Sequence, residues 1–250
     1  MPAFDLAALT SPVDPGMRVG IGLPPGDPRE REVVRRAEFC SLSAYPDTVA
    51  LLDALRAGEV DSAVRGSLPS SSFLEAVRMR APGRLRRIAL LLLPTGAPFL
   101  LGPVGIDEGG NLPEALRLLS DLRVFCDLLG WEPRVAALSA GRPEDAARGG
   151  RIRSTIQRAE VLAAEDDVRA YHITIEEALP WANCLLAPDG VTGNLIYRTL
   201  VHLGGGRSLG ALYFPLSLRL ADTSRNGTVE EYLGAIALAA LGSPTAGVRA

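Results

Sequence analysis

The sequence predicts an α/β protein whose strands form a parallel sheet covered by helices on both faces. Two observations lead to this prediction. Short apolar runs alternate with longer segments of helical periodicity, and the composition, 47% hydrophobic and 22% charged, is that of a globular protein. At 250 residues the chain can bury a substantial core, as one large domain or as two smaller ones.

The first part of the chain repeats a strand–helix pattern. The expected elements are a strand at 18–23, helices at 30–40 and 48–58, a strand at 59–66 and a helix that begins in the Ser-rich stretch 67–72. Residues 87–106 are strongly apolar, but Pro and Gly interrupt them repeatedly. They therefore predict two buried strands around a turn and not a membrane span.

The second part begins with an amphipathic helix over 111–131. Its apolar face is expected to contain Ala115, Leu118, Leu119, Leu122, Phe125, Cys126 and Leu129. The elements expected after it are a strand at 134–142, a helical stretch at 143–166, a strand that enters a loop at 182–194, a helix at 195–206, the last strand within 209–225 and the last helix at 228–241.

The Arg-rich segment 81–87, which also contains Pro and Gly, is the expected seam between two lobes. We predict a first lobe of residues 1–85 plus 228–250, built on a parallel sheet, and a second lobe of residues 86–227.

Charge and composition exclude several classes of protein. The net charge is −3, so the chain lacks the basic surface that nucleic acid requires. All 26 basic residues are Arg, which excludes Schiff-base chemistry, pyridoxal phosphate, a Walker-A loop and a protein-kinase site, because each needs a Lys. The two histidines form no zinc motif, and no metal site or bound cofactor is expected.

The three cysteines are widely spaced and contain no CxxC pair, which is typical of reduced core thiols. The N-terminus is acidic and Pro-rich and does not resemble a signal peptide. We expect a cytoplasmic protein that binds neither membrane nor nucleic acid.

Ligands in open α/β sheets bind where strands end and helices begin. The first loop of this kind is 65–72. It is either a set of helix caps or a phosphate site, with equal weight. Its candidate ligand residues are Gly66, Ser67, Ser70, Ser71 and Ser72.

Two further polar loops follow apolar strands. In residues 139–148, Arg142 and Arg148 either grip an anion or pair with neighbouring acids on the surface. In residues 105–111, Asp107 and Glu108 are either ligand contacts or helix caps.

Residues 188–194 read PDGVTGN. The glycines, with Asp189 and Asn194, indicate either a close approach of the backbone to a ligand or a tight turn.

The last candidate loop precedes the final helix. Thr228 and Glu231 have the spacing of a capping box, which accounts for the Glu without any chemistry. The capping box does not account for Asp222, Ser224 and Arg225 directly before it, and these suggest an anion site.

The segment 189–240 resembles the C-terminal part of the phosphate acetyl- and butyryltransferases. The likeness rests on DGVTGN, on IYR, and on DTSRNGTVEE, which is similar to that family's NDLSRGxSVE segment. Together with IDEG and SAGRPED, these segments are most similar to a short, methyltransferase-related branch of methanogenesis-marker proteins.

The resemblance implies a two-lobed, three-layer α/β/α fold like that of isocitrate and isopropylmalate dehydrogenases, with a shortened first lobe, and a homodimer. It also implies acyl transfer between an acyl phosphate and a thiol such as coenzyme A. Arg225 would bind the phosphate or the acyl carbonyl, Ser224 would orient the thiol or the oxyanion, and Glu231, an Asp in the family, would take the thiol proton.

Two alternatives stay open. One is a non-catalytic protein that binds coenzyme A or phosphate, or an accessory to a methyltransferase, on the same fold. The other is an NAD-dependent dehydrogenase of that fold, although the aspartate cluster of a metal-dependent decarboxylating enzyme is missing from the sequence.

Overall fold

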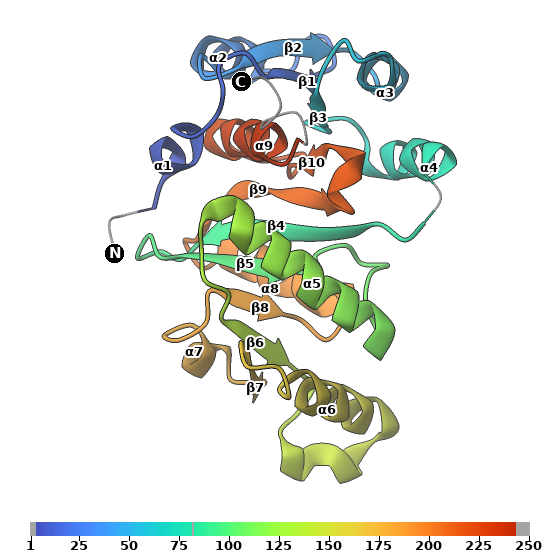
Figure 1. Ribbon diagram of the computed structural model, residues 1–250, viewed down its shortest axis with the longest axis vertical. Helices are drawn as coiled ribbons and strands as arrows, with labels where there is room; N and C mark the ends of the chain where they lie inside the picture. Colours follow the sequence, from blue (N-terminus) through green and yellow to red (C-terminus); the bar gives the residue numbers. More distant parts are fainter. Residues whose placement is uncertain (1–3, 82, 244–250) are drawn as a thin grey trace. The chain divides into compact units, whose positions relative to one another are not determined.

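The structure is a computed structural model that describes residues 4–81 and 83–243. It consists of two compact units (Figure 1). The first contains residues 1–85 and 207–250, and the second contains residues 86–206. Residues 1–3, 82 and 244–250, which belong to the expected first lobe and seam, lie outside the described residues.

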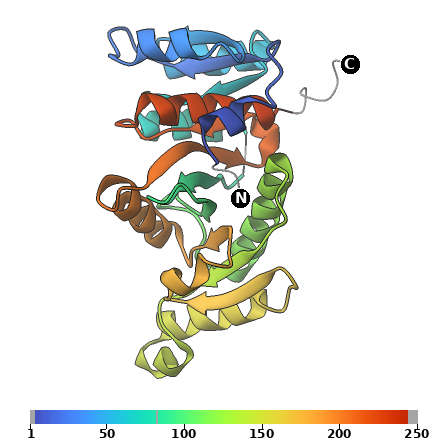
Figure 2. The ribbon, with the colours of Figure 1, turned by 90° about the vertical axis from the view of Figure 1, so that its left-hand side faces the viewer.

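The first unit combines both ends of the chain, and Figure 2 shows its blue and red segments next to each other. Its strands run in the order β2-β1-β3-β10-β9. Its helices and strands are α1 (Leu6–Thr10), β1 (Arg18–Gly22), α2 (Glu30–Arg36), β2 (Ser41–Tyr45), α3 (Thr48–Ala57), β3 (Ser62–Val64), α4 (Ser70–Arg80), β9 (Arg207–Phe214), the short 3₁₀ helix η2 (Leu216–Leu218), β10 (Leu220–Asp222) and α9 (Val229–Leu241).

Helix α9 is the central helix of the first unit. Ten of its residues, 231–240, are buried, and it packs on β9, β3, β10 and β1 with α1 and α2 beside it. It approaches β9 closely, since a Cβ added to Gly210 would lie 2.7 Å from the Ala235 Cβ. Helix α3 packs on β1 and β3 and contacts α4. Apolar residues of α3, α4 and β3 form a buried cluster there.

The second unit has strands in the order β4-β5-β8-β6-β7. Helix α5 packs on β5 and β8, α6 packs on β6 and β7, and α8 packs on β5. Its elements are β4 (Arg86–Leu92), β5 (Pro98–Gly102), α5 (Leu112–Leu129), β6 (Val135–Leu138), the 3₁₀ helix η1 (Pro143–Arg148), α6 (Gly150–Leu162), β7 (Val168–His172), α7 (Ile175–Ala178), β8 (Cys184–Leu186) and α8 (Gly190–His202).

The predicted α/β class is confirmed, but the strands are not all parallel. Strand β10 pairs parallel with β3 and antiparallel with β9, and β4 and β5 form an antiparallel pair. The expected face of α5 is confirmed except at Leu129, which is only half-buried; residues such as Leu118 and Phe125 are buried along it.

Residues 207–227, which we expected in the second lobe, group with the first unit. The reason is pairing: β10 is hydrogen-bonded to β3, and β9 is hydrogen-bonded to β10 and covered by α9. The boundary drawn from the sequence at residues 227/228 therefore lies about one strand pair too late along the chain.

No helix among the described residues is both long enough and apolar enough to cross a bilayer.

Candidate functional site

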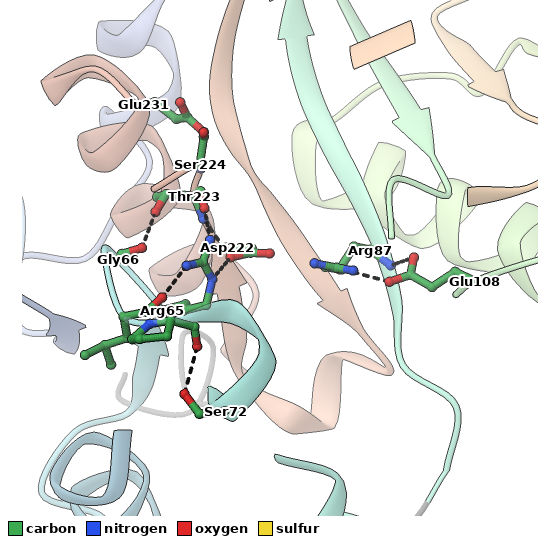
Figure 3. A network of polar contacts seen from close by, with 11 residues as sticks. Arg65, Gly66, Ser72, Arg87, Glu108, Asp222, Thr223, Ser224 and Glu231 are labelled. Atoms are coloured by element: carbon green, nitrogen blue, oxygen red, sulfur yellow. Dashed lines mark hydrogen bonds and ion pairs between the residues drawn. The ribbon is translucent and has the colours of Figure 1, made fainter. Parts of the chain in front are cut away.

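Three parallel strands of the first unit end at the same edge of its sheet. They are β1, β3 and β10, with β3 paired to both others. The loops that follow them are 23–29, 65–69 and 223–228. The second loop leads into the Ser-rich start of α4, and the third follows Asp222 and carries Ser224 and Arg225. Figure 3 shows Arg65, Ser72, Asp222, Thr223 and Ser224 in this region.

A buried ion pair joins two of these loops. Arg65 and Asp222 are only 4% and 6% exposed, and Arg65 Nε donates to Asp222 Oδ1 at 2.5 Å (Figure 3). The guanidinium also donates to the carbonyls of Leu68, at 2.6 Å, and Thr223. Asp222, a predicted substrate ligand, is thus engaged in holding the ends of β3 and β10 together.

Thr223 adds a second link between the same loops, because its hydroxyl donates to the carbonyl of Gly66 at 2.9 Å. Gly66 itself has φ +62°, and a Cβ there would lie 2.0 Å from the Gly22 carbonyl oxygen. Its glycine character is therefore required by the chain's own packing.

The serines do not cap the helix that they begin. The N-cap of α4 is Pro69, which has no side-chain capping bond. Ser72 donates to the Pro69 carbonyl at 3.2 Å. Ser70 is half-buried, and Ser71 is exposed. Within the described residues, the capping interpretation of this cluster is therefore not realised, and the first backbone N–H groups of α4 have no side-chain acceptor. Ser67 is half-buried, and its backbone N donates to the Gly22 carbonyl.

Residues 224–231 form a turn followed by the start of α9. Thr228 is the N-cap, and its hydroxyl accepts from the Glu231 N–H at 3.2 Å. The Glu231 carboxylate is buried, 4% exposed, and accepts from the Ser224 N–H at 2.7 Å. Glu231 therefore lies beside Ser224, and it contacts the Ser224 main chain.

Arg225 is exposed on this turn, and its side chain has no hydrogen bond or ion pair with any described residue. Ser224 is half-buried. The structure thus brings the predicted Ser224, Arg225 and Glu231 onto one turn, with one of them buried and one open to solvent.

Asp27 and Arg29, which the sequence did not single out, complete this edge of the sheet. Arg29 Nε and Nη2 donate to the two carboxylate oxygens of Asp27 at 2.9 and 2.8 Å. This hydrogen bonding from Arg29 lowers the pKa of Asp27 from its ordinary 3.8 to about 2. The signal that could have found the pair is its position directly after the first strand.

In the second unit, Glu108 is buried in a pair with Arg87. Its carboxylate accepts from Arg87 Nε at 2.7 Å (Figure 3), from the Arg87 N–H at 2.8 Å and from the Gly105 N–H at 3.2 Å. Burial raises the pKa of Glu108 although Arg87 opposes this. Asp107 is exposed, and the cap of α5 is Asn111, so neither acid fills the capping role considered for them.

Asp189 is the N-cap of α8. One carboxylate oxygen accepts from the N–H and the hydroxyl of Thr192, both at 2.8 Å, and the other accepts from Arg151 at 2.9 Å. Burial alone would raise the pKa of Asp189, but these hydrogen bonds hold it below its usual value. Asn194 donates to the Val104 carbonyl at 3.0 Å.

The glycines of this segment serve the fold. A Cβ on Gly190 would lie 1.6 Å from the Gly105 carbonyl oxygen, and one on Gly193 would lie 1.9 Å from that of Pro103. Packing alone therefore accounts for these glycines, because the space that a side chain would need is filled by residues 103–105.

The two arginines of the 139–148 loop are both exposed. Arg148 pairs with Asp145 at 2.9 Å, which is the surface-pairing alternative. The backbone N–H of Arg142 donates to the same carboxylate at 3.0 Å. Among the described residues, no group of three or more His, Cys, Asp or Glu could hold a metal ion.

No protein-family model matches the chain, but known proteins do. The chain is 34% identical over 255 residues to an uncharacterized methyltransferase of Methanopyrus kandleri, a match that covers 90% of this chain and 98% of that protein. It is 39% identical over 184 residues to the Methanosarcina mazei protein named putative methyltransferase mtx subunit X, covering 71% of this chain. The chain spans 65% of the length of that relative.

Solved structures of phosphotransacylases and phosphotransacetylases share this fold. A branched-chain phosphotransacylase of Enterococcus faecalis superposes with a TM-score of 0.67 at 17% identity, covering 90% of this chain and 99% of that one. A phosphotransacetylase of Streptococcus pyogenes gives 0.66 at 14% identity, covering 93% and 97%. The predicted fold and the resemblance to the short methanogen branch are confirmed by these comparisons.

Proposed function

We propose, on the premise that the chain belongs to the family of the mtx subunit X proteins and their methanogen relatives, that it transfers an acyl group between an acyl phosphate and a thiol such as coenzyme A. The proposal is supported by two features of one sheet edge: a helix start without a side-chain cap, and an exposed arginine on the neighbouring loop. The N-terminus of α4 has no side-chain cap, and Arg225 is exposed and unpaired within the described residues.

The link between these groups is structural. The loop that leads into α4 is held to the loop that carries Arg225 by the Arg65–Asp222 pair and by the Thr223–Gly66 hydrogen bond. A helix start with open N–H groups attracts a phosphate, and a guanidinium can bind two of its oxygens at once. These two elements, at the same sheet edge, would bind the phosphate together.

In the proposed reaction the thiolate attacks the carbonyl carbon of the acyl phosphate, and the carbon–oxygen bond to phosphate breaks. Arg225 and the start of α4 would hold the phosphate as it leaves. The Ser224 hydroxyl would donate to the oxyanion of the tetrahedral intermediate. Glu231, whose carboxylate accepts from the Ser224 N–H, would act as the base. It would give up this hydrogen bond and accept the thiol proton instead.

We expect purified protein to form a thioester from coenzyme A and at least one of acetyl, propionyl or butyryl phosphate. Arg225→Ala should lower kcat/KM at least about a hundredfold, because the charge that binds the leaving phosphate is lost. Arg56→Ala, which removes an exposed arginine of α3, is the matched control and should leave the rate unchanged. Equal rates for wild type and Arg225→Ala would refute the assignment of this site.

A second candidate function is that of a non-catalytic binding or accessory protein. The buried, main-chain-bonded Glu231 favours it, because the proposed base is already engaged. Calorimetry with coenzyme A and with inorganic phosphate separates the two candidates. Binding that Arg225→Ala weakens, without turnover of the three acyl phosphates, identifies the accessory protein. Light scattering on the same sample tests the homodimer that we also propose.

A further inference from the structure

The side chain of Arg29 contacts three parts of the first unit at once. Its Nε and Nη2 donate to Asp27, and its Nη1 donates to the carbonyls of Arg225 at 2.6 Å and of Gly227 at 3.2 Å. Its Cζ lies 4.6 Å from the centre of the Tyr232 ring. The guanidinium therefore connects the loop after β1, the turn before α9 and α9 itself.

These contacts differ from those of an ordinary surface pair. The side chains of Arg29 and Asp27 are 19% and 5% exposed, whereas Arg35 and Glu32 of the adjacent helix, which also form a two-bond pair, are 66% and 42% exposed. A largely buried, two-pronged pair holds its geometry, while an exposed pair is weakened by water and side-chain freedom. Asp27 therefore fixes the direction in which Arg29 presents Nη1.

The turn that receives Nη1 has few internal constraints. The Gly227 N–H donates to the Ser224 carbonyl at 2.9 Å, and the Ser224 N–H is held by Glu231, while Arg225 and Asn226 are exposed. Because a peptide unit is planar, fixing the carbonyls of residues 225 and 227 fixes the peptide planes that follow those two residues. Arg29 thus holds the part of the turn that the Ser224–Glu231 bond does not reach.

We propose that Arg29, oriented by Asp27, is a positioning residue that holds the 224–227 turn in the conformation in which Arg225 binds an anion. The inference deepens the proposed function and rests on it for the identity of the anion. Arg29 acts through Arg225 and has its own donors occupied by Asp27 and the two carbonyls.

The first test measures the turn and needs no ligand. Amide hydrogen exchange is followed in wild type, Arg29→Lys, Asp27→Asn and the control Arg35→Lys. Lysine keeps the charge but cannot bridge two carboxylate oxygens and two carbonyls at once. We expect amides 224–227 to exchange about tenfold faster in the first two variants, with β1 and β3 unchanged, and no change in the control.

The second test measures inorganic phosphate affinity by calorimetry, with Arg29→Lys made in wild type and in Arg225→Ala. We expect about tenfold weaker binding in the wild-type background and no further loss once Arg225 is absent, since coupled residues are not additive. Equal losses in both backgrounds would mean that Arg29 contacts the anion itself, and would overturn the inference.

The two arms separate the two hypotheses. If wild type binds no phosphate, the proposed function fails while the exchange arm still decides whether Arg29 holds the turn. If exchange at 224–227 is the same in Arg29→Lys and wild type, the inference fails whatever the protein binds.

Discussion

Asp222, which the sequence suggested as part of an anion site, has a structural role in its pair with Arg65. Both charges are buried, and their remaining capacity is met by the carbonyls of Leu68 and Thr223 and by the Thr223 N–H. Such a pair gives little net stability against an apolar replacement, but removal of one partner leaves an uncompensated buried charge. The pair therefore fixes the loop that carries Ser224 and Arg225 to the loop that leads into α4.

We expect Asp222→Ala to lower the free energy of unfolding by about 3–5 kcal/mol, because Arg65 would stay buried without its carboxylate. Urea denaturation measures this change. The control is Asp53→Ala, which removes a carboxylate, 43% exposed, that contacts Arg56 and Arg80, and whose cost should stay below about 1 kcal/mol. Similar costs for the two variants would contradict the structural role given to the buried pair.

At the scale of elements, α8 shows how glycine determines packing. The only buried residues of this helix in the described chain are Gly190 and Gly193, and both lie against the backbone of residues 103–105. The helix thus packs against the segment that follows β5, and the contact is made by its glycines. The DGxxGN pattern, whatever it binds, has a packing requirement of its own.

We expect Gly193→Ala to destabilise the protein by about 1–3 kcal/mol, because the new Cβ would overlap the Pro103 carbonyl and force the helix outward. Gly150→Ala is the matched control. It also lies in a helix, where a Cβ meets nothing within 4 Å, and it should raise stability by about 0.4–1 kcal/mol. Thermal and urea unfolding of the two variants give the comparison, and a neutral Gly193→Ala would disprove the close contact.

Interior elements were predictable because burial leaves a pattern in the sequence. The apolar runs that became β4 and β5 and the buried face of α5 are examples. Strands β2 and β7, which the sequence did not reveal, stand at the ends of the strand orders of their units. Their residues are largely exposed or half-buried, as in SLSAY, so hydrophobic patterning was absent.

The site was predictable only in part, for a related reason. Ser224, Arg225 and Glu231 are neighbours in sequence, and one turn brings them together. The bonds of Arg65 and Arg29 join residues 157 and 196 positions apart, and only the pairing of β3 with β10 and of the first loop with the last turn creates them. One sequence contains no local signal for such distant partners.

For the whole molecule, stability in acid depends on carboxyl groups whose pKa values are shifted in both directions. Hydrogen bonds from Arg29 and Arg123 lower the pKa of Asp27 and Asp167, whereas burial raises that of Glu108 and Asp121. A lowered pKa adds stability above the ordinary value that is lost as pH falls, and a raised pKa acts in the opposite direction.

We expect the free energy of unfolding of wild type, relative to that of Asp27→Asn, to depend on pH. This difference should be larger at pH about 5 than at pH about 2, by about 2 kcal/mol. Asp27 has an ordinary pKa of 3.8 and a folded value of about 2, so its contribution disappears across this interval. Urea unfolding at several pH values gives the difference. A gap between the two proteins that does not change with pH would show that Asp27 is not held by Arg29 in solution.

The first unit is discontinuous, with residues 1–85 joined to residues 207–250, whereas residues 86–206 form an uninterrupted unit. During translation the middle of the chain can therefore fold as it leaves the ribosome, while β1, β2 and β3 wait for β10 and α9. A nascent chain stopped at residue 206 would present an unfinished sheet edge, and the turn that carries Arg225 would be assembled among the last events of synthesis.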